Sequence, residues 1–421
     1  MNQVAESEIN IWGQRLISLM LILLGVSFAG ILILGSYYDQ PITQALSFKV
    51  SDMERFDSGL GAHSFGDFQD NRYALPTSDY PDIWTNSDLA HPPTALIPNY
   101  LAKLIQLRFG VQVALYCFLI ALATCTAIPA IFASRQMRKP IDSLLTLLLL
   151  SIFTQPLIMT FDRGNTVGFA VPFLLLFAFG IRDDRANLTV VGLVGAFAIR
   201  PQYALIGIAL IALRRFRAAV ISSVSAAVIF FGSFLFLPGK YAENFESWRK
   251  NLVSYSDYSG RGSVFPVNIS LSTALDYLLY IPNYYTLALV LTATCLAVFF
   301  FFRSKKTLTL LLIVSLILPA LIPKTSFAYY STFVLVIAAL IISDRNFLVD
   351  ESHAKSRFSC AKFYNYLLIV VVAISLAPIP FVREVGRNSI ALESFSTMWA
   401  IVLIATLVYQ VLEFRRERAA T

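Results

Sequence analysis

Charged side chains are scarce in this sequence of 421 residues: only 14% are Asp, Glu, Lys or Arg, while 57% are hydrophobic. A soluble domain carries roughly 25% charged residues, so this composition excludes a soluble globular protein. The apolar runs are continuous over about 15 to 22 residues and do not alternate as barrel strands do. The sequence therefore predicts an all-α polytopic membrane protein.

Cysteine and histidine are also scarce. The cysteines are Cys117, Cys125, Cys295 and Cys360, and three of them lie inside apolar runs. This pattern predicts neither a disulfide framework nor a Cys-x-x-Cys metal site. The three histidines are too far apart in the sequence to indicate zinc. We expect no metal and no cofactor, although Asp-rich segments also offer oxygen ligands for Mg²⁺ or Ca²⁺.

About twelve apolar runs are candidate membrane helices. The turns between them that carry Lys and Arg fall on one side when the runs alternate, which explains the net charge of +7 without a nucleic-acid partner. Both termini are then cytoplasmic, and residues 1–421 form a single integral domain in the cell membrane. The runs are 14–36, 111–133, 142–158, 165–181, 188–200, 203–214, 218–237, 284–302, 307–322, 327–343, 363–382 and 395–414.

One long polar stretch, residues 37–109, interrupts the apolar runs. It holds nine of the 26 acidic residues of the chain, eight of them Asp. Within it, Pro41–Arg55 and Pro93–Leu107 carry apolar residues at helical spacing, and Asn268–Tyr280 repeats this pattern in a later loop. We expect interfacial helices here, and an extracytoplasmic loop that forms part of the active-site cavity.

Two pairs of runs meet at charged residues on the predicted outer side. The run 188–213 is broken at Arg200-Pro201, and neither half is long enough to cross a hydrocarbon core of ~30 Å. The runs 142–158 and 165–181 meet at Asp162-Arg163-Gly164-Asn165. Short or broken helices are tolerated in a membrane only where protein or a water-filled cavity covers them. Ionisable residues at such breaks are functional candidates.

Six short motifs lie on the predicted outer side. They are Gly66-Asp67-Phe68, His91-Pro92-Pro93, Asp162-Arg163-Gly164-Asn165, Ile199-Arg200-Pro201-Gln202, Asn268-Ile269-Ser270-Leu271, and Lys324-Thr325-Ser326 with Tyr329-Tyr330. Their order and spacing resemble the polyprenol-phosphate-dependent glycosyltransferases of the C clan, in particular glycosyltransferase family 87, the α-mannosyltransferase group. The sequence departs from the family pattern where His91 replaces Tyr, Arg200 replaces Lys and Ile269 replaces Gln.

The resemblance implies a fold like that of the C clan and a reaction on the extracytoplasmic face. A hexose, with mannose expected, would move from a polyprenyl-phosphate sugar to a lipid-linked or cell-envelope glycan acceptor. Such a transfer needs a base for the acceptor hydroxyl and cations for the leaving phosphate. We expect Asp67 to be the general base and Arg163, Arg200 and Lys324 to bind the donor phosphate. We expect His91, Asn165, Asn268 and Tyr330 to bind substrate.

Structural interpretations compete with these assignments. Most Asp residues of a polar loop are solvated or cap helices, and Asp39, Asp52 and Asp57 are alternatives to Asp67. The cations at span ends also fit ion pairs, such as Arg163 with the adjacent Asp162, or side chains that snorkel to lipid headgroups. For the whole chain, the alternatives are a transporter or flippase of a lipid-linked sugar, and a non-catalytic assembly protein. A transporter predicts repeated halves, and we find no internal repeat.

Overall fold

The computed structural model describes residues 10–37, 65, 67–68, 91–137, 139–237, 239–260, 270–271, 284–304, 306–323, 326, 328–344, 347–348, 360–378 and 389–420. These residues form helices and their connections, and none of them lies in a strand. The all-α prediction is confirmed for this part of the chain. The gaps include Pro41–Arg55 and most of Asn268–Tyr280, so these two predicted interfacial helices lie outside the described residues.

Most helices follow the predicted runs, but the helix over Tyr241–Gly260 was not predicted. The long ones are α1 (Ile11–Tyr37), α6 (Val111–Ser134), α12 (Phe216–Ser233), α13 (Tyr241–Gly260), α15 (Tyr284–Phe301), α18 (Cys360–Leu376) and α19 (Ser389–Ala420). The shorter ones are α5 (Ile97–Phe109), α7 (Pro140–Ser151), α8 (Gln155–Arg163), α9 (Val171–Arg182), α10 (Ala186–Ile199), α11 (Ile208–Ala212), α16 (Thr307–Leu321) and α17 (Phe333–Ser343). The 3₁₀ turns are η2 (Pro93–Leu96), η3 (Thr166–Ala170), η4 (Pro201–Gly207), η5 (Phe234–Phe236) and η6 (Ala328–Thr332).

The chain is a membrane protein by the length and composition of its helices. Among the described residues, four helices are apolar and long enough to span a membrane, and the bent pair α7–α8 is a fifth candidate. The large apolar side chains that face outward lie mainly on peripheral helices such as α1, α6, α12 and α19. Apolar surface of this extent suits lipid rather than water.

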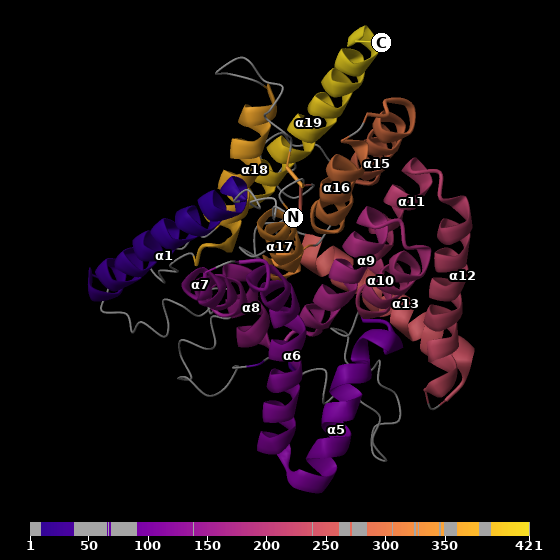
Figure 1. Cartoon of the computed structure of the whole chain (residues 1–421). Coiled ribbons are helices and arrows are strands. Elements are labelled where there is room, and N and C mark those ends of the chain that lie inside the picture. Colours follow the sequence, from indigo (N-terminus) through magenta and orange to yellow (C-terminus); the bar gives the residue numbers. More distant parts are fainter. Residues whose placement is uncertain are drawn as a thin grey trace, which may run out of the picture.

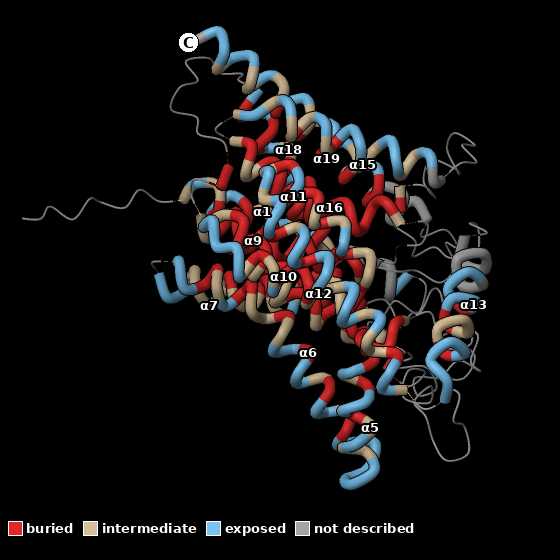
Figure 2. Tube along the Cα trace, turned by 90° about the vertical axis from the view of Figure 1, so that its right-hand side faces the viewer, coloured by how far each residue is buried: buried red, intermediate tan, exposed pale blue. Residues whose placement is uncertain are grey.

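The interior of the molecule is built on the most apolar helices. Helices α9, α10, α16 and α17 lie at the centre, with α1 beside α18 on one side and α12 on the other (Figure 1). Nearly every side chain of α16 and α17 is buried, and the buried residues are concentrated in this central region (Figure 2). A helix that is apolar all round can be enclosed by neighbours without leaving polar groups unpaired, which explains this position.

Glycine allows α9 and α10 to pack with their backbones in contact. A Cβ atom at Gly192 of α10 would lie 2.3 Å from the backbone nitrogen of Phe177 in α9, and one at Gly180 would lie 2.3 Å from that of Thr189. Small residues permit such close helix packing in membranes. The contact packs α10, which precedes Arg200, against α9, which follows Asn165 and η3.

The prediction of one helix over 142–158 is wrong. The chain leaves helical geometry at Ile152 and starts again at Gln155, so α7 and α8 meet at 47°. Pro156 lies in the first turn of α8, where its missing N–H costs nothing, whereas inside a continuous helix it would remove a hydrogen bond. The break leaves α8 as a helix of nine residues that ends at Arg163.

The prediction of a helix over Pro93–Leu107 is confirmed by η2 and α5. Pro93 starts η2 in the position that suits proline. Helix α5 folds back along α6, and the hairpin projects from the central region (Figures 1 and 2). Ile97, Leu101 and Leu104 of α5 are exposed, in keeping with an apolar-patterned helix at an interface.

Candidate active site

The turn after α8 places Arg163 and Asn165 on either side of one glycine. Gly164 has φ +62°, the left-handed conformation that glycine adopts without strain. Its N–H donates to the carbonyl of Phe161 (3.0 Å), and the N–H of Asn165 donates to that of Thr160 (3.0 Å). This pair of bonds is the Schellman arrangement, which ends a helix while satisfying its last carbonyls.

Asp67 is held against this turn by its neighbours in the first loop. The N–H of Phe65 donates to the carbonyl of Asp162 (2.9 Å). Phe68 is buried and its ring centroid lies 4.9 Å from that of Phe118 on α6. An aromatic side chain buries a large apolar area and so makes a strong anchor for a short polar segment. The position of Asp67 is therefore fixed by the backbone hydrogen bond of Phe65 on one side and by the buried ring of Phe68 on the other.

The carboxylate of Asp67 is bound on both oxygens. Its Oδ1 accepts hydrogen bonds from Arg163 Nη2 (2.8 Å) and Arg163 Nε (3.2 Å), and its Oδ2 accepts one from Asn165 Nδ2. The Asp67 side chain is 15% exposed and that of Arg163 is 27% exposed. A partly buried, charge-assisted contact of this kind fixes geometry more strongly than an exposed ion pair.

Arg200 brings a second guanidinium to the same place from the end of α10. Its backbone is extended because Pro201 follows and starts η4. The side chain is only 2% exposed. Nη2 donates to Asn165 Oδ1 (2.9 Å), Nη1 contacts the His91 ring, and the guanidinium lies 5.6 Å from the ring centroid of Tyr330. A buried cation held by neutral hydrogen-bond acceptors and an aromatic face is a costly arrangement, and such sites are usually functional.

His91 must be neutral to make its contact with Arg200. Arginine nitrogens only donate, so the imidazole has to present an unprotonated nitrogen, of which Nε2 lies 2.9 Å from Arg200 Nη1. Burial of the ring and the charge of Arg200 lower the pKa of His91 well below its usual range. The side chain therefore serves as an acceptor for Arg200 near neutral pH.

Asp67, His91, Arg163, Asn165 and Arg200 thus form one connected polar network. Two guanidiniums and one carboxylate leave it with a net charge of +1. Three segments that are far apart in the sequence contribute to it: the first loop, the turn after α8 and the end of α10. The two guanidiniums differ in access, because Arg163 is partly exposed whereas Arg200 is enclosed.

The structure brings together most of the residues that the sequence singled out. Tyr330 adjoins the network through Arg200 and is 7% exposed. Lys324 and Asn268 lie outside the described residues. The sequence also offered no sign that Phe118 would anchor the loop, because nothing distinguishes it from the other apolar residues of its helix.

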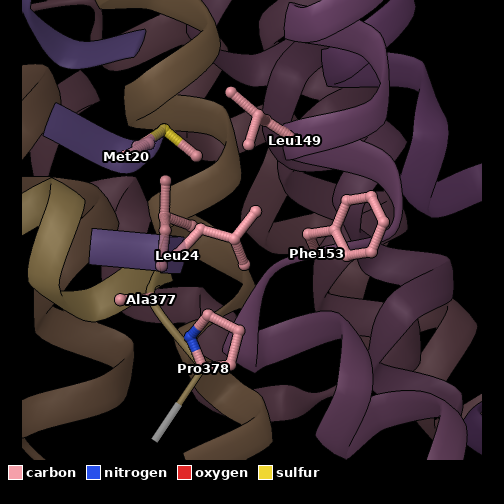
Figure 3. Close-up of a pocket in the computed structure, with 7 residues that line it drawn as sticks. Met20, Leu24, Leu149, Phe153, Ala377 and Pro378 are labelled. Carbon is pink, nitrogen blue, oxygen red and sulfur yellow. The ribbon is translucent and has the colours of Figure 1, made fainter. Parts of the chain in front are cut away.

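Other parts of the described chain offer less chemistry. A crevice between α1, α7 and α18 is lined entirely by apolar side chains: Met20, Leu24, Leu149, Phe153, Leu376, Ala377 and Pro378 (Figure 3). None of these residues belongs to the polar network. Among the described residues, no three His, Cys, Asp or Glu side chains gather as metal ligands do. The polar network is therefore the candidate active site.

Fold and site together define an α-helical membrane protein with a carboxylate–guanidinium centre. The chain belongs to glycosyltransferase family 87, whose family model matches residues 90–323, more than half of the sequence. The match includes His91, Arg163, Asn165 and Arg200 and begins after Asp67. No curated protein matches the chain. The protein is a membrane glycosyltransferase, which decides between the transferase and the transporter or assembly interpretations of the sequence.

Proposed function

We propose that the protein transfers a hexose, with mannose the expected sugar, from a polyprenyl-phosphate sugar to a lipid-linked or cell-envelope glycan. The reaction takes place on the extracytoplasmic side of the cell membrane. The proposed topology has about twelve crossings, cytoplasmic termini and a fold of the C-clan type in one domain, with residues 37–109 forming part of the cavity. Its support is the distribution of basic turns and the family membership.

The observation that carries this proposal is the charge of the polar network. The network holds one carboxylate and two guanidiniums, and the surplus of one positive charge attracts an anionic donor. Arg163 is the better candidate for direct contact with the phosphate because it is partly exposed and its planar fork matches phosphate oxygens. Arg200 is enclosed, so its charge stabilises the donor phosphate mainly by electrostatic attraction through space and not by direct contact. Lys324 is a further proposed phosphate ligand.

The proposed reaction is a single displacement at the anomeric carbon. The acceptor hydroxyl oxygen forms the new glycosidic bond while the bond from the anomeric carbon to the phosphate oxygen breaks. The phosphate leaves with the bonding electron pair and stays on the polyprenyl chain, where Arg163 stabilises its added charge. Asp67 accepts the hydroxyl proton. One carboxylate is enough, because a phosphate leaves more readily than an alkoxide, and the configuration inverts.

The remaining proposed contacts surround this centre. His91 and Tyr330 flank Arg200 and would line the side of the cavity where the substrate binds. Asn268 is proposed as a contact to the sugar. No metal or cofactor is part of the proposed mechanism, because the guanidiniums supply the positive charge that the leaving phosphate needs.

The test is transfer of radiolabelled hexose from a panel of polyprenyl-phosphate sugars by the purified protein in lipid. Asp67→Asn should lose activity by about a hundred- to ten-thousandfold if Asp67 is the base. The matched control is Asp142→Asn, at the far end of the α7–α8 pair from Arg163, which should retain activity. Full activity of Asp67→Asn would exclude Asp67 as the base. Inhibition by a chelator that a divalent ion reverses would contradict the metal-free mechanism.

A further inference from the structure

Asn165 lies at the centre of the polar network and is closed to substrate. It is 1% exposed in a site whose other members include a partly exposed guanidinium. Its Oδ1 accepts hydrogen bonds from Arg200 Nη2 (2.9 Å) and from the backbone N–H of Val167 (2.9 Å), and its Nδ2 donates to Asp67 Oδ2. Both ends of the amide are therefore engaged by the protein itself.

The direction of this amide is fixed by its partners. Arg200 and the Val167 N–H are donors only, so they require the oxygen of the side chain. In the opposite orientation the NH₂ group would face two donors and the oxygen would face the carboxylate, and every contact would be repulsive. The nitrogen must therefore point at Asp67, as a donor that cannot become an acceptor.

We propose that Asn165 is a positioning residue that holds the carboxylate of Asp67 for proton transfer and links it to the buried charge of Arg200. This inference rests on the proposed function of Asp67 as the base. It changes the expectation that Asn165 binds substrate, since the amide has its polar atoms turned to the protein. It also gives Arg200 an effect on the base through one intervening side chain, because hydrogen bonds in series polarise one another.

The linkage fixes the rotamer of Asp67. The amide N–H donates to Oδ2, while Arg163 occupies Oδ1. When a donor phosphate draws Arg163 toward itself, Oδ2 stays bound to Asn165 and the carboxylate keeps its direction. Oδ1 then becomes available for the acceptor hydroxyl.

Three variants of purified, lipid-reconstituted protein test the proposal. In Asn165→Ala, kcat should fall by about ten- to a hundredfold, the range expected for a lost hydrogen bond to a charged group, with the donor KM almost unchanged.

In Asn165→Asp, the acidic limb of the pH–rate profile should move up by about one pH unit or more, because a second carboxylate beside Asp67 disfavours loss of its proton. Asn187→Asp, an exposed position at the other end of α10, is the control and should match the wild type.

A second measurement does not depend on activity. The thermal midpoint of Asn165→Asp relative to the wild type should fall as the pH rises from about 5 to 8. In the variant, two carboxylates in contact retain a proton in the folded state that the unfolded chain does not bind, so the folded state is favoured at low pH. Arg163 and Arg200 stay charged in this range. His91 contacts the same Arg200, so the two proteins are compared in a His91→Gln background, where the difference isolates the new carboxylate.

The outcomes separate this proposal from the proposed function. If the wild type transfers hexose but Asn165→Asp shows neither the moved acidic limb nor the pH-dependent midpoint, the positioning proposal is overturned and the function stands. A raised KM with unchanged kcat in Asn165→Ala would also overturn it and make Asn165 a substrate ligand. If the wild type transfers no hexose but the midpoint of Asn165→Asp falls with pH, the function fails and the contact between Asn165 and Asp67 stands.

Discussion

Gly164 faces Phe68 so closely that a Cβ atom added to it would lie 2.8 Å from the Cβ of Phe68. Phe68 adjoins Asp67, and Gly164 separates Arg163 from Asn165. The distance between the first loop and the end of α8 is therefore set by a residue that has no side chain. The Asp67 contacts to Arg163 and Asn165 depend on this approach.

Replacing this glycine should separate the two halves of the site. In Gly164→Ala, the left-handed backbone costs about 1–2 kcal/mol, and the new methyl group pushes Phe68 away. We expect transfer activity per folded molecule to fall more than tenfold, because Asp67 loses its position. Thermal unfolding and hexose transfer measure the two effects. Gly25→Ala in α1 is the control, since no atom lies within 4 Å of the added Cβ, and an equal effect in both variants would contradict the prediction.

Removing the guanidinium group of Arg163 should affect transfer activity far more than the stability of the fold. Its ion pair with Asp67 is partly exposed, and such pairs contribute about 0–1 kcal/mol. Arg163→Lys keeps the charge but loses the planar fork, so we expect roughly a tenfold loss in kcat/KM, and at least about a hundredfold loss in Arg163→Ala. Arg185→Ala, an exposed arginine before α10, serves as the control. Steady-state kinetics at varied donor concentration measure kcat/KM for each variant. A wild-type kcat/KM in Arg163→Ala would refute the prediction.

Acidification should destabilise the protein through His91. The pKa of His91 in the folded protein is well below its usual range, while that of the unfolded chain is about 6.5. Between these values the unfolded chain binds more protons, so the free energy of unfolding decreases as the pH falls through about 6.5. A series of thermal midpoints between pH 5 and 8 measures the slope. His91→Gln, which retains an acceptor for Arg200 but does not titrate, should have a flatter profile, and an unchanged slope would be evidence against the assignment.

The side chain of Phe68 anchors the loop that carries Asp67, so kcat should fall further when a substitution at this position buries less apolar surface. Phe68 is 1% exposed, and Phe→Ala at buried sites costs about 3–5 kcal/mol where the site cannot collapse. We expect Phe68→Ala to lose more than tenfold in kcat, and Phe68→Leu to recover most of it, because leucine still packs on Phe118. Phe236→Ala, at a ring that is 88% exposed, is the comparison. A wild-type kcat in Phe68→Ala would show that the ring does not position Asp67.

Most helix boundaries could be predicted from the sequence because the apolar runs end at charged or proline-containing turns. The run 111–133 matches α6 (Val111–Ser134), and 188–200 matches α10 (Ala186–Ile199). The break between α7 and α8 was not predicted, although Ser151, Thr154, Gln155 and Pro156 interrupt the apolar run 142–158 there. Hydropathy measures transfer into lipid and contains little information on where a helix bends.

For the site, the sequence identified the residue types but not their contacts. It paired Arg163 with Asp162 as the structural alternative, whereas the structure shows the guanidinium bonded to Asp67, 96 positions away. Contacts at such separation follow from how the helices pack, which a single sequence does not specify. The sequence placed Arg200 at a helix break that protein or a water-filled cavity must cover, but it did not exclude a side chain that reaches lipid headgroups.

The enclosure of Arg200 has a consequence for biogenesis. Its direct neighbours His91, Asn165 and Tyr330 are neutral, and the carboxylate nearest to it along the hydrogen bonds described is that of Asp67. An uncompensated cation that is buried in protein costs several kcal/mol. The first loop leaves the ribosome before α10, so the counter-charge is made before the cation that needs it. Docking of that loop completes the chain of hydrogen bonds through Asn165 that joins the buried cation to its counter-charge.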